Sequence, residues 1–205
     1  AGCFESSFIS TNYFSKNIKM SSMHPILHAI NVSKQFPGTL ALDNVQLELL
    51  PGEIHAVMGE NGAGKSTLMK ILSGVYTSDS GEIYIDGRSI SPSNPREALM
   101  LGVSIVHQEL SVIPTLTVAE NIFLGRMPTR YGPLRLVDTR VMNRDADTLL
   151  ARLGATFTGD TPLSRLSLAQ MQLAEIAKAL SLNARLVIMD EPTSVLTPQE
   201  VEILF

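Results

Sequence analysis

Residues 59–67 combine glycines, a lysine and hydroxyl side chains at a spacing that suits phosphate chemistry. They read Gly-Glu-Asn-Gly-Ala-Gly-Lys-Ser-Thr and fit the pattern G-x-x-x-x-G-K-[ST]. Glycines let a backbone curl so that several N–H groups point at phosphate oxygens. Lys65 can set its ammonium against β- and γ-phosphates, and the Ser66 hydroxyl can ligate Mg²⁺. The predicted nucleotide-binding residues of the loop are Gly59, Glu60, Asn61, Gly62, Ala63, Gly64, Lys65, Ser66 and Thr67.

The sequence on either side of this loop predicts the elements that position it. Upstream, Pro51-Gly52 marks a turn, and residues 53–58 form a short, mostly apolar run typical of a strand. Downstream, residues 66–72 carry apolar side chains at helical spacing, and Gly74 follows as a stop signal. A helix that begins near Lys65 adds its positive end to the anion site. Strand, glycine loop and helix is the arrangement that this motif requires.

A second motif, at residues 186–191, places carboxylates at the end of an apolar run. The segment reads Leu-Val-Ile-Met-Asp-Glu. A buried parallel strand would deliver Asp190 and Glu191 to its carboxyl end, where ligands of α/β sheets bind. Asp190 is then the predicted Mg²⁺-shell residue, and Glu191 the predicted general base that polarises an attacking water. A strand that ends in solvated acids is the alternative, and the glycine loop favours the catalytic interpretation.

Composition limits the class of protein. The chain has 205 residues, 44% of them hydrophobic, enough for one globular domain with a core. A net charge of −4 gives no basic footprint for nucleic acid. Cys3 is the only cysteine, which excludes paired-cysteine zinc sites and favours a reducing, intracellular compartment. No run of eighteen apolar residues is present, so the sequence predicts no membrane span.

Both ends of the chain differ from the rest. Residues 1–22 are rich in Ser, Asn and Phe without clear periodicity, and they lack the apolar stretch of a secretory signal. We expect a disordered leader there, either native or an upstream extension of the reading frame. Residues 200–205 end inside a helical pattern, which suggests truncation. The expected domain therefore covers 23–205 and is incomplete at its C-terminus.

The order of predicted elements indicates an α/β fold. Residues 24–36 and 40–50 alternate apolar and polar side chains, as an antiparallel strand pair would. A helical stretch at about 109–182, inserted after Gln108, could form a subdomain. The remaining predicted strands are 81–85, 103–106 and 186–189, with a tight turn at 86–87, and the predicted helices are 95–101, 118–124, 138–153 and 167–182.

The run Leu166-Ser167-Leu168-Ala169-Gln170 resembles the Leu-Ser-Gly-Gly-Gln signature of ATP-binding cassette (ABC) ATPases. Its distance from the Asp190-Glu191 pair fits that family, and the resemblance covers about residues 25–205. Gln108 matches the family's Q-loop glutamine, which senses Mg²⁺ and the γ-phosphate. Phe36 matches the aromatic residue that stacks on adenine. The resemblance implies a P-loop NTPase core with an N-terminal antiparallel β subdomain and a helical subdomain.

In this family two cassettes face each other head to tail, so the resemblance implies a composite site. ATP would lie between the glycine loop of one cassette and the signature of the other. Ser167 and its helix would then bind the γ-phosphate of the opposite nucleotide. The implied catalytic residues are Glu191 and Gln108, the implied Mg²⁺ residues are Ser66, Gln108 and Asp190, and the implied signature residues are Leu166, Ser167, Leu168, Ala169 and Gln170. Thr197 stands where the family's D-loop usually has Asp.

The Leu168-Ala169 variant of the signature, together with Phe36 to Leu42 and His107 to Leu110, looks like the N-terminal cassette of bacterial monosaccharide importers. The ribose, galactose and xylose systems are the type members. The resemblance implies ATP and Mg²⁺ as cofactors and a place on the cytoplasmic face of the plasma membrane. The implied partners are membrane permease subunits, a second cassette and, indirectly, a periplasmic sugar-binding protein.

Other functions stay open at this point. The family uses a histidine about thirty residues beyond the Glu191 position, which this chain does not reach, so we expect a fragment that binds ATP but hydrolyses it poorly alone. A soluble ABC ATPase of DNA repair or translation is the alternative, although the zinc pairs and basic linkers of such proteins are lacking. A GTPase or small-molecule kinase would lack the Asn-Lys-x-Asp guanine motif and would leave the signature unexplained.

Overall fold

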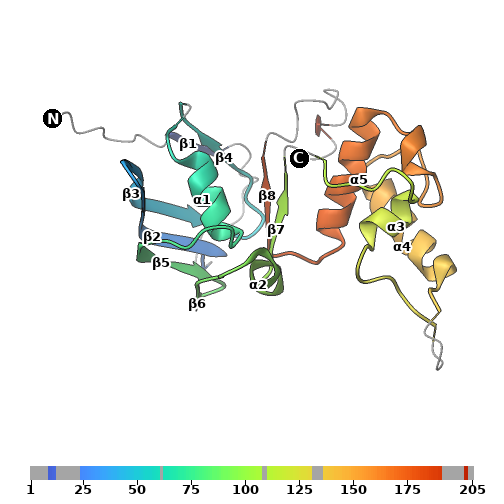
Figure 1. The fold of residues 1–205 in the computed structure, drawn as a ribbon, viewed down its shortest axis with the longest axis horizontal. Helices are drawn as coiled ribbons and strands as arrows, with labels where there is room; N and C mark the ends of the chain where they lie inside the picture. Colours follow the sequence, from blue (N-terminus) through green and yellow to red (C-terminus); the bar gives the residue numbers. More distant parts are fainter. Residues whose placement is uncertain are drawn as a thin grey trace. The chain divides into compact units, whose positions relative to one another are not determined.

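The computed structural model describes residues 24–60, 62–107, 110–130, 136–190 and 201–202, and the backbone alone at 9–12. The chain divides into two compact units, Ala1–Val103 and Ser104–Phe205 (Figure 1). The first contains most of the strands, and the second contains most of the helical residues. Strands and helices are mixed along the chain, which agrees with the predicted α/β class.

A four-stranded antiparallel sheet forms the larger part of the first unit, in the order β3–β2–β5–β6. Its strands are β2 (Leu27–Phe36), β3 (Thr39–Leu49), β5 (Ser80–Ile85) and β6 (Arg88–Ile90). The predicted pairing of 24–36 with 40–50 is confirmed, because Leu27 lies opposite Leu49 and Phe36 opposite Thr39. A two-residue turn joins β5 to β6, with positive φ at both Asp86 and Gly87, as a type I′ hairpin requires.

The elements around the glycine loop occur in the predicted order. β4 (His55–Met58) leads into the loop, and α1 (Lys65–Leu72) leaves it. α1 buries Leu68, Ile71 and Leu72, the apolar positions that define its helical spacing. A four-residue strand, β1 (Ile9–Asn12), pairs antiparallel with β4 and was not predicted. α2 (Pro95–Met100) completes the unit, with Asn94 as its N-cap and proline in its first turn.

The second unit packs three α-helices and a 3₁₀ turn around one apolar cluster. These elements are α3 (Val118–Ile122), α4 (Thr139–Arg152), η1 (Leu163–Arg165) and α5 (Leu168–Leu180). The fully buried members of the cluster include Ile122, Leu150, Leu163 and Ile176. Burial of a side chain of this size stabilises a fold by roughly 1.5–3 kcal/mol, so this cluster holds the helices together.

Two short strands, β7 (Val103–Val106) and β8 (Leu186–Met189), lie side by side as a two-stranded sheet. Both have the bounds that the sequence predicts. Neither strand has an exposed residue, which is typical of strands buried on both sides. The backbone N–H of Asp190 donates to the carbonyl of Val106 at 3.1 Å, so the two strands end together.

α4 illustrates how local sequence sets the limits of an element. Asp138 is the N-cap, as predicted, and its carboxylate accepts a hydrogen bond from the N–H of Val141. That backbone hydrogen bond is the main reason why the pKa of Asp138 lies below its usual value. Gly154 follows the helix with φ of 64°, a conformation that terminates helices. Among the described residues, no helix combines the length and the apolar character needed to cross a bilayer.

Candidate nucleotide site

The glycine loop is pressed against β3 at Gly64. This residue has φ of +86°, and a Cβ atom built on it would lie 2.4 Å from the carbonyl oxygen of Ala41 and 2.7 Å from Cδ2 of Leu42. No side chain fits such a position, and the backbone conformation favours glycine as well. The last glycine of the motif is therefore required by packing within the first unit, before any ligand is considered.

The start of α1 leaves its backbone donors without a side-chain partner. Gly64 is the N-cap, and among the described residues no side chain accepts from the first turn. The loop is tightened by a hydrogen bond from the N–H of Ala63 to the carbonyl of Glu60 at 3.1 Å. Unsatisfied N–H groups and the positive end of the helix dipole together make an anion site. This arrangement can bind the phosphates of a nucleotide.

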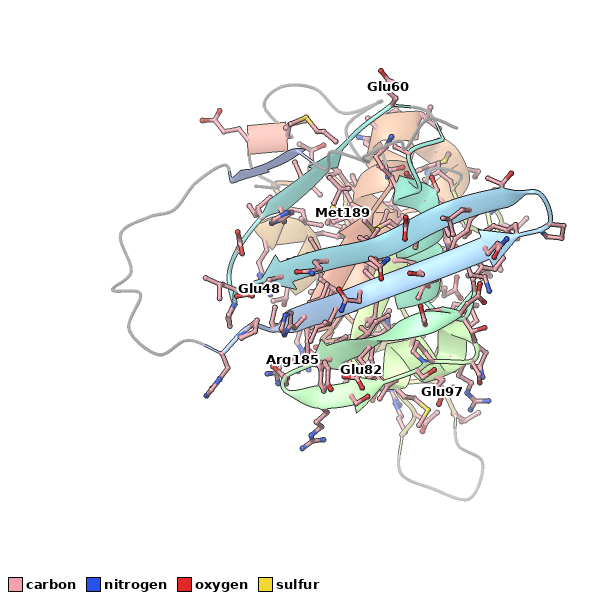
Figure 2. All side chains as sticks on the ribbon, turned by 90° about the vertical axis from the view of Figure 1, so that its left-hand side faces the viewer. Glu48, Glu60, Glu82, Glu97, Arg185 and Met189 are labelled. Atoms are coloured by element: carbon pink, nitrogen blue, oxygen red, sulfur yellow. The ribbon has the colours of Figure 1, made fainter. Side chains whose placement is uncertain are left out.

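The ammonium group of Lys65 lies against the loop that it follows. Its Nζ donates to the carbonyl of Gly59 at 2.6 Å and to the carbonyl of Glu60 at 2.8 Å. Two loop carbonyls thus hold the ammonium next to the loop backbone. The oxygens of a polyphosphate can replace these carbonyls as hydrogen-bond acceptors. The side chain of Glu60 points outward from the loop (Figure 2), so its carboxylate does not occupy the anion site.

The remaining loop residues have different surroundings. Ser66 is exposed and Thr67 is half-buried, so the Ser66 hydroxyl is open to a ligand. Asn61 lies outside the described residues. His55, on the strand before the loop, is half-buried with Nδ1 3.6 Å from Oε1 of Glu53, which suits the packed histidine that its position suggests.

Phe36 lies at the end of β2 and is half-buried. Its ring meets the ring of Tyr76 edge to face, with centroids 5.3 Å apart and an interplanar angle of 68°. Tyr76 follows α1 closely, and its backbone N–H donates to the carbonyl of Lys70. The aromatic residue that the sequence assigns to the base is therefore linked to the helix that starts at the phosphate loop.

In the second unit, Asp190 is exposed and directly follows β8. Its backbone N–H donates to the carbonyl of Val106, so the last residue of β7 lies beside Asp190. The sequence analysis places Gln108 after one strand and Asp190 after another. The structure shows that these two strands, β7 and β8, end side by side. Gln108 and Glu191, the two predicted catalytic residues, lie outside the described residues.

Ser167 begins α5 with a capping box. Its hydroxyl accepts from the N–H of Gln170 at 3.3 Å, and the Gln170 side chain accepts from the N–H of Ser167 at 2.9 Å. Leu166 is buried in the apolar cluster, whereas the Leu168 side chain is 57% exposed. Ala169 and Gln170 are half-buried. The five signature residues thus form a helix start with an exposed apolar side chain beside it.

A buried carboxylate on α5 escaped the sequence analysis. Glu175 is 6% exposed, and one of its oxygens, Oε2, has no hydrogen-bond partner among the described residues. Burial raises the pKa of Glu175, and the ammonium of Lys178, 3.4 Å from Oε1, opposes that rise. Lys178 also donates to the carbonyl of Ser111 at 3.1 Å. The available signal was a charged residue among the mostly apolar buried positions of α5, which also include Gln172.

Asn121 fixes the loop that precedes α3. Its side chain is 3% exposed; its Oδ1 accepts from the N–H of Ile113 at 2.7 Å, and its Nδ2 donates to the carbonyls of Ile113 and Thr117. The neighbouring Glu120 forms a capping box with Thr117. These residues therefore have a local structural role in holding the loop.

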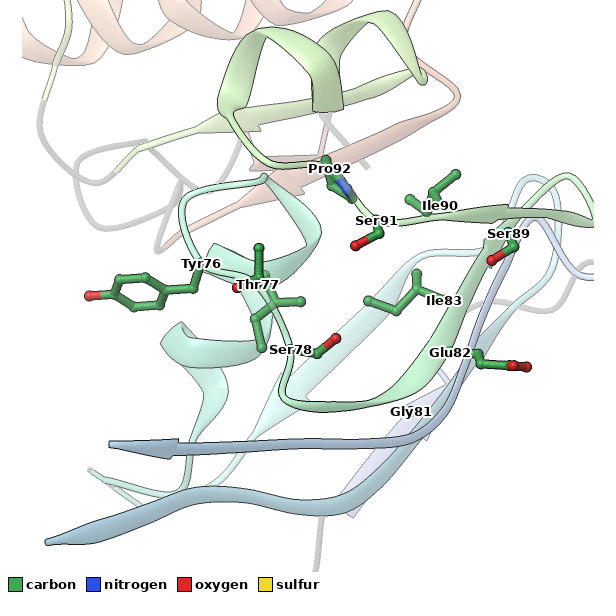
Figure 3. A pocket seen from close by; sticks show the side chains of 11 residues that line it. Tyr76, Thr77, Ser78, Gly81, Glu82, Ile83, Ser89, Ile90, Ser91 and Pro92 are labelled. Carbon is green, nitrogen blue, oxygen red and sulfur yellow. The ribbon is translucent and has the colours of Figure 1, made fainter. Parts of the chain in front are cut away.

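A small cavity of about 100 Å³ lies between the segment after α1 and strands β5 and β6 (Figure 3). Ser78, Ser89 and Ser91 line it together with Ile83. None of its lining residues belongs to the glycine loop. The cavity is therefore separate from the phosphate site, and its walls lack the cationic groups that a polyphosphate would need.

A family model described as ABC transporter matches residues 42–194. The chain belongs to this family. A ribose import ATP-binding protein of Rubrobacter xylanophilus is 52% identical over 183 residues, which are 89% of this chain and 36% of that protein. An arabinose import ATP-binding protein of Yersinia pestis is 48% identical over 90% of this chain and 35% of its own length. A galactose/methyl galactoside import ATP-binding protein of Photobacterium profundum is 52% identical over 88% and 36%.

Solved structures of ABC cassettes share the fold. The ADP conformation of an ATP-binding cassette of an ABC transporter superposes with a TM-score of 0.75 at 28% identity, over 88% of this chain and 74% of that one. A dimeric cassette bound to ADP and phosphate gives 0.69 at 26% identity, over 87% and 79%. The ABC ATPase fold predicted from the motifs is confirmed. The chain spans about a third of the length of the curated relatives that it matches.

Proposed function

We propose that this chain is the ATP-binding part of an energising subunit for monosaccharide import. The observation that carries the proposal is the glycine loop, with its uncapped helix, the tightly packed Gly64 and the loop-bound ammonium of Lys65. Support for the sugar branch comes from relatives that are named ribose, arabinose and galactose import ATP-binding proteins and are about half identical to the chain.

In this proposal the loop and Phe36 bind the two ends of ATP. Residues 59–67 cradle the phosphates with backbone N–H groups, Lys65 neutralises part of their charge, and Phe36 stacks on adenine. Thr67 completes the first turn of the helix. Ser66 is exposed, which supports the proposal that its hydroxyl is available to a ligand.

The residues present suit Mg²⁺ held mainly by the nucleotide. Among the described residues, no three His, Cys, Asp or Glu side chains gather into a metal cage. Mg²⁺ typically takes one or two protein oxygens and completes its shell with water and phosphate, and the Ser66 hydroxyl and Asp190 carboxylate are oxygen donors of that kind. Gln108 is the third proposed ligand. Bound Mg²⁺ would supply charge neutralisation for the γ-phosphate.

Hydrolysis in this proposal needs two copies of the site. Glu191 acts as general base on the attacking water, and Gln108 senses the γ-phosphate. The signature residues 166–170 of a facing cassette, Ser167 foremost, bind the γ-phosphate from the other side. A single copy of the chain is therefore expected to bind ATP but to hydrolyse it slowly.

The proposed organisation and partners follow the same logic. Residues 23–205 form the cassette, and its helical part at about 109–182 transmits nucleotide-driven motion to membrane permease subunits. A second cassette faces the glycine loop, and a periplasmic sugar-binding protein delivers the sugar to the permease. The site of action is the cytoplasmic face of the plasma membrane.

Calorimetric titration of the 205-residue chain with ATP and Mg²⁺ tests the nucleotide part. We expect saturable binding of ATP and weaker binding of GTP, with slow steady-state hydrolysis. Glu191→Gln should leave binding unchanged. Absence of ATP binding by a folded chain would overturn the proposal, and rapid hydrolysis that Glu191→Gln abolishes would refute the slow turnover of a single copy.

Affinity capture on the tagged chain from detergent-solubilised membranes tests the transport part. Recovery of an integral membrane permease, increased by ATP in the Glu191→Gln variant, is the expected result. Recovery of ribosomes or DNA in place of a permease would contradict a transport function and support the soluble alternative.

A further inference from the structure

Two side chains without a role in the proposed function, those of Tyr76 and Lys34, contact the ring of Phe36. The Tyr76 ring packs edge to face against it, with centroids 5.3 Å apart, and the ammonium of Lys34 lies 5.7 Å from the centroid of its ring. Lys34 and Phe36 are two residues apart on β2, so their side chains lie on the same face of the strand. A cation at this distance is attracted by the electron-rich face of the ring.

Lys34 is itself held in place by Asp79. The Lys34 Nζ donates to Oδ1 of Asp79 at 2.6 Å, and the N–H of Gln35 donates to Oδ2 at 2.7 Å. The N–H of Asp79 in turn donates to the carbonyl of Ser33 at 2.9 Å. These hydrogen bonds, from Gln35 first and Lys34 second, lower the pKa of Asp79. The carboxylate is therefore ionised at neutral pH and bonded to Lys34 and Gln35, while the backbone N–H of Asp79 adds a bond to Ser33.

Tyr76 is anchored to α1, the helix that begins at the glycine loop. The ammonium of Lys70, in the last turn of α1, lies 5.5 Å from the centroid of the Tyr76 ring. The backbone N–H groups of Val75 and Tyr76 both donate to the carbonyl of Lys70, at 2.8 and 3.1 Å. The Tyr76 ring points away from the small cavity that its segment lines, so it does not serve to fill that cavity (Figure 3).

We propose that Tyr76 and the Asp79–Lys34 pair are positioning residues that fix the Phe36 ring for stacking on the base of a bound nucleotide. The Tyr76 ring and the Lys34 ammonium both contact the Phe36 ring and together restrict how that ring can turn. Fixing the ring beforehand lowers the entropy cost of binding. The proposal rests on the nucleotide binding proposed above and adds that base affinity depends on these three residues.

The test compares Mg²⁺-ATP with Mg²⁺-tripolyphosphate, which has the phosphates but no base. Titrations of the 205-residue chain give a Kd for each, and the ratio of the two isolates the base contribution. We expect Tyr76→Leu and Lys34→Met each to raise the Kd for ATP about threefold to tenfold relative to tripolyphosphate. Tyr76→Phe and Lys34→Arg, which keep the ring and the cation, should leave the ratio unchanged.

A double variant separates positioning from a general structural role. Phe36→Ala should raise the ATP/tripolyphosphate ratio by about tenfold or more, since base stacking on an aromatic ring is lost. If Tyr76 acts through Phe36, then Tyr76→Leu added to Phe36→Ala should weaken ATP binding no further. Thermal unfolding of each variant, measured alongside, confirms that the chain is folded.

The outcomes are distinguishable. Equal weakening of ATP and tripolyphosphate by the Tyr76 and Lys34 variants, no weakening at all, or additivity with Phe36→Ala would overturn the positioning role while leaving nucleotide binding intact. Failure of the folded parent chain to bind either ligand would instead overturn the proposed function itself.

Discussion

The two helices whose N-termini are proposed to bind phosphate, α1 and α5, begin in opposite ways. α1 starts from Gly64, a left-handed residue without a side chain, and among the described residues no side chain caps its first turn. α5 starts from Ser167, whose hydroxyl and backbone N–H are both engaged with Gln170. Both helices have the same dipole, but only α1 leaves its first donors without a side-chain acceptor.

This difference separates a binding site from a helix that is stable by itself. At α1 the loop lacks the stability of a side-chain cap, and in the proposed function a bound phosphate would satisfy the N–H donors. At α5 the N–H of Gln170 is already paired with the Ser167 hydroxyl, so fewer backbone donors remain for a phosphate, and Ser167 can offer only its hydroxyl proton. We therefore expect binding at α1 to come first and contact at α5 to follow only when a second cassette closes.

The largest expected effect comes from giving the α1 start a side chain. Gly64→Ala should lower the free energy of unfolding by about 3 kcal/mol, because the new Cβ meets the carbonyl of Ala41 and the residue is strained at positive φ. Denaturant unfolding measures the loss. Gly62→Ala is the matched control: φ there is +89° but nothing lies within 4 Å, so about 1 kcal/mol is expected. Equal losses in both would show that packing against β3 is unimportant.

The next effect concerns the cation of the uncapped site. Lys65→Ala should weaken ATP binding about a hundredfold, since a charged hydrogen bond contributes about 1.5–3 kcal/mol, while leaving the unfolding free energy nearly unchanged. Calorimetry with Mg²⁺-ATP measures it. Arg96→Ala, which removes an exposed cation from the same unit, is the control and should bind like the parent. A Lys65→Ala affinity within threefold of the parent would show that the loop alone binds the phosphates.

A smaller effect is expected at the capped helix. Ser167→Ala should reduce the unfolding free energy by about 1 kcal/mol, whereas Ser167→Gly should cost only a few tenths, as at other N-caps. Neither change should alter ATP affinity in a dilute, single-copy titration. An affinity loss as large as that of Lys65→Ala would contradict the order of binding given above.

The smallest effect concerns Glu175 within α5. Because burial raises its pKa above the ordinary 4.5, the folded chain holds this proton more tightly than the unfolded chain. Its contribution to stability is present at low pH and falls as the pH rises through the raised value. Glu175→Gln should flatten the decline in unfolding free energy that begins above the ordinary pKa of 4.5 and continues through the raised pKa. Glu202→Gln, at an exposed carboxylate, serves as the control, and an unchanged slope for Glu175→Gln would refute the assignment.

The sequence predicts those features that depend on nearby residues. The strands 103–106 and 186–189 and the caps of α4 follow from short apolar runs, Asp138 and Gly154, and they occur where expected. The glycine loop follows from its motif. β6 was missed because three residues carry too little pattern, and β1 because no periodicity marks it.

The features that the sequence does not reveal depend on distant partners. Asp79 meets Lys34 across 45 positions, so no local pattern shows that it supports Phe36. Gly64, the N-cap of α1, must be glycine because Ala41 of β3 lies against it, and the two positions are far apart in the sequence. The roles of Gln108, Glu191 and Asn61 remain predictions, because these residues lie outside the described part of the chain.

The buried amide of Asn121 has a mechanical consequence. Its hydrogen bonds to both the N–H and the carbonyl of Ile113 tie the loop before α3 to the helix itself. The same loop is bonded to η1, because the N–H groups of Leu163 and Ser164 donate to the carbonyls of Leu116 and Pro114. We therefore expect the loop, α3 and η1 to move together when any one of them is displaced.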